Sequence, residues 1–190
     1  GCASLGVEIS AAHLLRAVYG TANVVWAGII GTMLLYLTLG YRWGGRLADR
    51  RPEPALFYRL LAWAGLSAGA AIVLARLLLR PAAAALAAIR VGPVVGTFVA
   101  ALALLAAPVL LLGSISPLAL RLALGAGDQS EQAGQAAGRI YAASTLGSLV
   151  GTFLPPLLLI PWLGARATYW LLAALLLLAA LAVWAKQLAL

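Results

Sequence analysis

The sequence has very little charge. Only 9% of its 190 residues are charged and 64% are hydrophobic, whereas soluble globular domains contain about 25% charged and about 45–50% apolar residues. The mean hydropathy is +1.03. A soluble chain of this length could not cover its surface with so few polar side chains. We therefore expect an integral membrane protein, because lipid is the solvent that suits this composition.

Cysteine, histidine and acidic residues are scarce as well. The single cysteine, Cys2, excludes an intrachain disulfide, and it lies in the same apolar run as the only histidine, His13. One cysteine and one histidine cannot form a usual protein-only metal site. Four of the five acidic residues fall in predicted loops, and no nucleophile has a base and an orienting group beside it. We predict no catalytic residues, no metal and no cofactor.

Basic residues exceed acidic ones, with 13 Lys and Arg against five Asp and Glu. In a soluble protein a net charge of +8 would suggest a nucleic-acid partner, but the sequence contains no nucleic-acid-binding motif. The arginines lie at the ends of apolar runs, where they would face anionic lipid head groups. We therefore predict that these basic residues interact with the lipid bilayer and that the protein does not bind nucleic acid.

Long apolar runs divide the whole chain into predicted spans. A transmembrane helix needs about 20 predominantly apolar residues. Six runs satisfy this requirement, at about 1–19, 23–41, 57–79, 93–113, 139–162 and 167–186. Because an open sheet edge cannot lie in lipid, the sequence predicts one all-α transmembrane domain over 1–190. The chain begins at Gly1 within an apolar pattern, and we expect residues to precede it.

The distribution of basic residues predicts the orientation of these spans. One side of the membrane would carry eight of them: Arg42, Arg46, Arg50, Arg51, Arg59, Arg121, Arg139 and Lys186. The other side would carry five: Arg16, Arg76, Arg80, Arg90 and Arg166. The positive-inside rule then places both termini and the 42–56 loop in the cytoplasm, with the protein in the plasma (inner) membrane.

The longest connection between spans is predicted at about 114–138. Ser116 followed by Pro117 is a favourable helix start, with serine as the N-cap and proline at the first helical position. Gly125 can end that helix. We expect a short helix at the cytoplasmic interface here.

The first span carries the most unusual polar residues. On a helix, Ser4, Glu8 and Tyr19 lie within about 60° of one another, and Arg16 lies about 80° from Glu8. An ionisable residue at membrane depth costs about 2.5–3.5 kcal/mol and normally faces a bundle interior or an aqueous cavity. Glu8, with Arg16 and Tyr19, is therefore the candidate site for a cationic solute or a proton. The alternative is that Glu8 pairs with Arg16 or with backbone and only holds helices together.

Glycines and prolines mark predicted packing positions in the fifth span. Gly147 and Gly151 form a small-xxx-small pattern that lets two helix backbones approach closely. Pro155 and Pro156 remove backbone donors and are expected to break or kink the helix. Such a break either serves packing alone or lines a cavity, as in transporters.

The end of the second span contains a motif, Gly45-Arg46-Leu47-Ala48-Asp49-Arg50. It resembles the loop between helices two and three of major facilitator transporters. The resemblance implies a tight turn at Gly45 and a conformational latch formed by Asp49 with Arg46 and Arg50. The sequence departs from that pattern after Arg51, where Pro52-Glu53-Pro54 replaces the expected glycine and basic pair.

A second resemblance covers nearly the whole chain. The motifs that carry it are Glu8-Ile9-Ser10-Ala11, Tyr19-Gly20, Val25-Trp26, Gly40-Tyr41, the 44–50 motif, Ser116-Pro117, the run 137–155, Ile160-Pro161 and Leu163-Gly164. Together they are similar to the membrane region of spermidine-synthase-like membrane proteins. The resemblance implies a half-major-facilitator-like bundle. The aminopropyltransferase domain that often follows in that family is not within 1–190, so polyamine synthesis is not implied.

These observations favour a membrane module that binds or transports a small organic solute, with polyamines as the first candidates. Because half-sized transporters need a second half, we expect a homodimer or a partner membrane subunit. The main alternative is a membrane anchor or structural subunit that transports nothing. A third alternative is the membrane half of an aminopropyltransferase.

Overall fold

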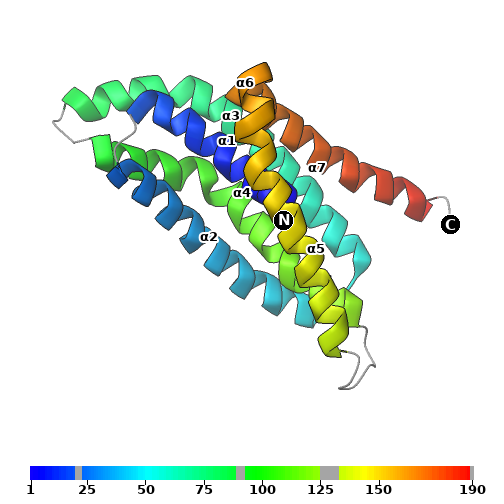
Figure 1. Cartoon of the computed structure of the whole chain (residues 1–190). Coiled ribbons are helices and arrows are strands. Elements are labelled where there is room, and N and C mark those ends of the chain that lie inside the picture. The colour runs from blue at the N-terminus through cyan, green and yellow to red at the C-terminus, as the bar shows by residue number, and fades with distance from the viewer. Residues whose placement is uncertain (20–22, 89–92, 125–132, 189–190) are drawn as a thin grey trace.

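The computed structural model describes residues 1–19, 23–88, 93–124 and 133–188, and all elements in these ranges are helical (Figure 1). They are α1 (Cys2–Tyr19), α2 (Asn23–Arg50), α3 (Pro54–Ala88), α4 (Pro93–Leu124), α5 (Ala133–Leu154), the π-helical segment η1 (Pro155–Leu159), α6 (Ile160–Leu163) and α7 (Ala165–Leu188). The predicted all-α class is confirmed.

Four helices are long and apolar enough to cross a membrane within the described part of the chain. Their apolar stretches are Pro54–Ala75, Phe98–Leu124, Gly134–Leu163 and Ala165–Ala182. Glu8, His13 and Arg16 make α1 more polar than these four. The chain is therefore a helical membrane protein with at least four candidate spans.

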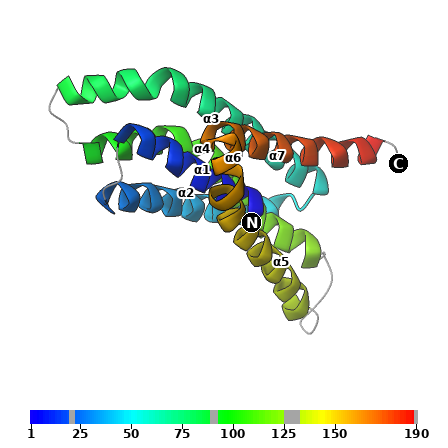
Figure 2. The same cartoon turned by 45° about the horizontal axis from the view of Figure 1, so that its top comes forward.

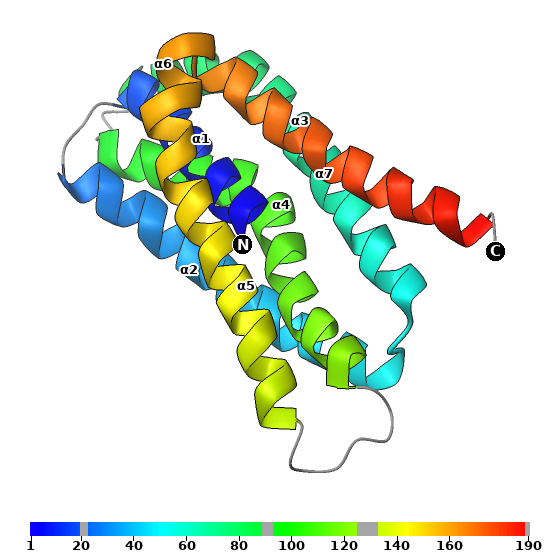
Figure 3. The same ribbon diagram turned by 45° about the vertical axis from the view of Figure 1, so that its right-hand side comes forward.

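The helices pack as a bundle around α1. Helix α2 runs along α4, and α3 packs against both α4 and α7. Helix α1 lies among α4, α5 and α7, so that it is covered on several sides (Figure 3). Helix α5 crosses the outside of the bundle and is the least enclosed of the candidate spans, with 11% of its apolar stretch buried (Figure 2).

The core is apolar and rich in small residues. Helix α1 buries Val7, Ala11, Ala12 and Leu15 against the same cluster that holds Tyr169 of α7. The facing helices contribute many alanines, namely Ala64 and Ala68 of α3, Ala100 and Ala101 of α4, and Ala173 of α7. Small side chains let backbones approach closely, which matters in lipid because van der Waals contact drives helix association there.

Two local predictions are wrong because helices continue where a turn or a new start was expected. Helix α2 extends through the motif to Arg50, so Gly45 lies inside a helix and does not form a tight turn. Helix α4 runs without interruption through Pro117 to Leu124, so no separate helix starts at Ser116. In both cases a long helix retains backbone hydrogen bonds that a loop would have to satisfy elsewhere.

The double proline does end the regular α-helix of α5. Pro155 and Pro156 have no backbone N–H, and the chain continues from Pro155 to Leu159 in π-helical geometry. The short α6 then ends at Gly164, whose φ of 84° is readily adopted only by glycine. This glycine lets the chain reverse from α6 into α7.

Candidate functional site

Glu8 is a buried carboxylate in the middle of α1. Its side chain is 5% exposed, and its Oε1 accepts a hydrogen bond of 3.1 Å from the Ser4 hydroxyl one turn earlier. Serine is neutral, so this bond orients the carboxylate without balancing its charge. Most other buried hydroxyls, those of Thr32, Ser114 and Thr168, bond to carbonyls of their own helix. A buried carboxylate is therefore the exceptional polar group of the core.

Arg16 does not pair with Glu8. The two residues are eight positions apart, which separates them by about 12 Å along the helix axis. The Arg16 guanidinium carbon instead lies 5.0 Å from the ring centroid of Trp26 on α2, and its Nε is buried without a hydrogen-bond partner. This cation–π contact positions Arg16 away from Glu8. The side chain of Tyr19, the third predicted site residue, lies outside the described part of the chain.

One tyrosine on another helix belongs to the wider surroundings of Glu8. Tyr41 of α2 lies within electrostatic range of both Glu8 and Tyr141 of α5. Both phenol side chains are exposed, at 49% and 61%. The sequence does not connect Tyr41 with Glu8, because the two residues are far apart in the chain and lie on different helices. A carboxylate in apolar surroundings suits an alkylammonium group, whose charge it can balance.

The start of α1 is held by the glycines of α5. A Cβ built on Gly151 would overlap the Cys2 carbonyl, and one on Gly147 would lie 3.1 Å from the Cys2 nitrogen. Gly147 and Gly151 thus lie where the two backbones touch, at Cys2, two residues before Ser4 on α1. Pro155 is buried and its ring lies near Gly6 of α1, while Pro156 is partly exposed. Gly147, Gly151 and Pro155 therefore position the helix that carries Glu8.

The remaining polar side chains of α1 have local roles. His13 is hydrogen-bonded through Nδ1 to the Ile9 carbonyl at 2.9 Å. Ser10 is fully buried, and its hydroxyl has no hydrogen-bond partner. It lies about 200° around the helix from Glu8, so it does not extend the carboxylate site.

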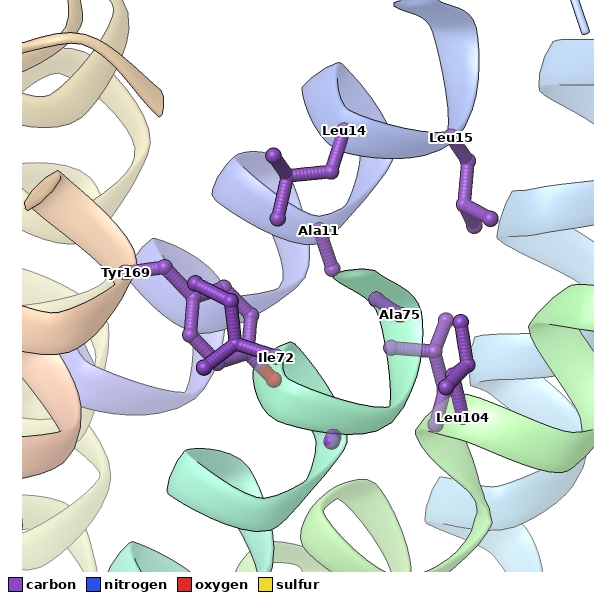
Figure 4. Close-up of a pocket in the computed structure, with 9 residues that line it drawn as sticks. Ala11, Leu14, Leu15, Ile72, Ala75, Leu104 and Tyr169 are labelled. Carbon is purple, nitrogen blue, oxygen red and sulfur yellow. The ribbon is translucent and has the colours of Figure 1, made fainter. Parts of the chain in front are cut away.

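A small cavity lies where α1, α3, α4 and α7 meet (Figure 4). Its volume is about 20 Å³, and its walls include Ala11, Leu14, Ile72, Ala75, Leu104 and Tyr169. This space holds about one water molecule, and a site with almost no polar partners stays dry. Glu8 is not part of its wall. The cavity is therefore a packing gap in the core.

The residues of the predicted latch lie on the last turns of α2. Arg46, Asp49 and Arg50 are exposed, and a Cβ on Gly45 would meet nothing within 4 Å. Ala48 between them is buried against Leu60 and Leu118. The structure thus anchors this turn by Ala48 and leaves the charged side chains on the surface.

The described residues contain no group of three or more His, Cys, Asp or Glu side chains that could hold a metal ion.

The chain matches no protein-family model, and no curated protein or solved structure matches it. The arrangement of Glu8 and its neighbours is therefore the main guide to function.

Proposed function

We propose that this protein is a six-span, half-major-facilitator-like module of the plasma membrane that binds and moves a small organic cation. The observation that carries the proposal is the burial of Glu8 beside a neutral partner. Glu8 is 5% exposed, and its carboxylate accepts a hydrogen bond from the neutral Ser4 hydroxyl. Its negative charge therefore still needs a positive partner. A cationic solute or a proton would satisfy it.

The surroundings of Glu8 favour an amine over an inorganic cation. An inorganic cation such as Ca²⁺ needs about six to eight oxygen ligands, whereas this region offers one carboxylate with one serine hydroxyl beside it, and Tyr41 within electrostatic range. An alkylammonium needs a counter-charge and apolar or aromatic walls for its carbons. Polyamines belong to this class, and the similarity to spermidine-synthase-like membrane proteins points the same way.

A second copy or a partner subunit would complete the transport path. Alternating access in transporters of this kind uses two related halves around a central site. Helix α5 is the least buried of the candidate spans and carries Tyr141 and the contacts to α1. We place the second half against α5, with Arg46, Asp49 and Arg50 as the latch between conformations.

Uptake of labelled putrescine and spermidine into proteoliposomes tests this function. We expect saturable uptake by the wild type and loss of at least tenfold in Glu8→Gln, which keeps the shape of the side chain and removes its charge. Glu53→Gln is the matched control, because Glu53 is exposed between α2 and α3. Equal uptake by both variants, or none by folded wild type, would reject Glu8 as the site or transport as the function.

The second candidate function is that of a membrane anchor or structural subunit. The hydrogen bond between Ser4 and Glu8 lies within one helix, and three cavities of the described structure are lined by residues other than Glu8. A carboxylate that only stabilises the bundle would fit this arrangement. In that case Glu8→Gln would change the thermal stability of the protein and no amine would bind.

A further inference from the structure

One face of α2 carries two arginines and a tryptophan that line a groove together with two leucines. Leu39, Arg42, Trp43 and Arg46 are spaced at i, i+3, i+4 and i+7, which places them on one side of the helix. With Leu110 of α4 they line an open cavity of about 460 Å³. All four α2 residues are exposed. The charge on this wall is +2, and no acidic residue lines it.

The groove owes its shape to a close approach of α2 and α4. A Cβ on Gly40 would lie 2.5 Å from the Leu110 carbonyl oxygen, and one on Gly44 would overlap the backbone of Ser114. This contact fixes Leu110 beside Leu39 and makes both part of one apolar wall. The exposed Leu35, one turn before Leu39, continues this apolar surface along α2.

The order of these residues along α2 matches the order of groups in a phospholipid. The apolar side chains Leu35 and Leu39 come first, Trp43 follows at the level where tryptophan favours the membrane interface, and the guanidinium groups of Arg42 and Arg46 lie around it. Arginine donates paired hydrogen bonds to phosphate oxygens. A free anion would contact only Arg42 and Arg46 and would leave the apolar residues Leu39 and Leu110 unused.

We propose that this groove is a binding site for an anionic phospholipid of the bilayer. Arg42 and Arg46 hold the phosphate, Trp43 packs against the glycerol region, and one acyl chain lies along Leu39 and Leu110. The site does not involve Glu8, and it shares only Arg46 with the proposed latch, so lipid binding can be measured separately from transport. A lipid bound here would cover the seam between α2 and α4.

Lipid titration of the purified protein by native mass spectrometry tests the proposal. We expect dioleoylphosphatidylglycerol to bind more tightly than dioleoylphosphatidylcholine, and Arg42→Gln combined with Arg46→Gln to weaken phosphatidylglycerol binding roughly tenfold or more. The control combines Arg51→Gln with Arg121→Gln. It removes the same charge from exposed positions that do not line the groove. We expect the phosphatidylglycerol affinity of this control to stay within about twofold of the wild type. Arg51 and Arg121 attract lipid head groups in general and do not form a defined site.

Two further measurements separate the lipid from other occupants. Leu39→Gln keeps both arginines and is expected to weaken binding of the dioleoyl lipid more than that of a dihexanoyl lipid, because only the long chain reaches Leu39. Inorganic phosphate is expected not to compete. Equal losses in the two double variants, no effect of Leu39→Gln, or displacement of the lipid by millimolar phosphate would each overturn the proposal. All these positions are exposed, and circular dichroism confirms the helical fold of each variant.

Discussion

Gly151 has no side chain, and this lets α5 approach the start of α1 closely. A Cβ there would overlap the Cys2 carbonyl of α1, which is backbone and cannot rotate away. We expect Gly151→Ala to destabilise the protein by about 1–3 kcal/mol through overpacking. Gly138→Ala is the control in the same helix, because a Cβ at Gly138 meets nothing within 4 Å. It should gain about 0.5–1 kcal/mol of helix propensity.

Thermal unfolding in detergent, followed by tryptophan fluorescence, measures both variants. A lower melting temperature for Gly151→Ala together with an unchanged or higher one for Gly138→Ala is the expected pair of results. Equal melting temperatures would show that α1 and α5 are not in backbone contact at Cys2.

Tyr169 is the largest fully buried side chain in the part of the chain that the structure describes, and it lines the small cavity beside α1. Tyr169→Ala removes the ring from a close-packed site and should cost about 3–5 kcal/mol. Trp162→Ala is the comparison, since Trp162 is 84% exposed and its loss should change stability by within about 0.5 kcal/mol. Chemical denaturation in mixed micelles compares the two, and similar losses would contradict the buried position of Tyr169.

At the level of helices, Pro117 tests the continuity of α4. A proline inside a helix removes a hydrogen bond and costs up to about 3 kcal/mol, so Pro117→Ala should raise the melting temperature. Pro54→Ala is the control, because Pro54 is the first residue of α3, where proline is favourable. No gain at Pro117, or a loss, would instead support a helix that starts at Ser116.

Sequence periodicity predicted where helices lie better than where they end. Long apolar runs required helices in lipid, and every element of the described residues is helical. The ends were less predictable, because Gly45 and Pro117 are local turn signals that the packing of Ala48 and Leu118 in one cluster overrides. The carboxylate at Glu8 was identifiable from its cost in lipid. Tyr41 in its surroundings was not, since it comes from another helix.

For the molecule as a whole, the two ends of the bundle define a testable orientation. The α2–α3 junction and the α6–α7 junction lie at opposite ends (Figures 1 and 3). Glu53 lies at the first and Ala167 at the second, and both are exposed. In a Cys2→Ser background, a membrane-impermeant maleimide should label Ala167→Cys in intact cells. It should label Glu53→Cys only after permeabilisation.

The arginines at the end of α2 are expected to set this orientation. Replacing Arg42, Arg46, Arg50 and Arg51 by glutamine leaves four basic residues on the predicted cytoplasmic side against five on the other. The positive-inside rule then favours the reverse insertion, so Glu53→Cys should become labelled in intact cells in at least part of the population. Replacing only Arg166 increases the original bias and should leave the labelling pattern unchanged. Unaltered labelling in the fourfold variant would mean that helix packing, rather than loop charge, determines how the bundle inserts.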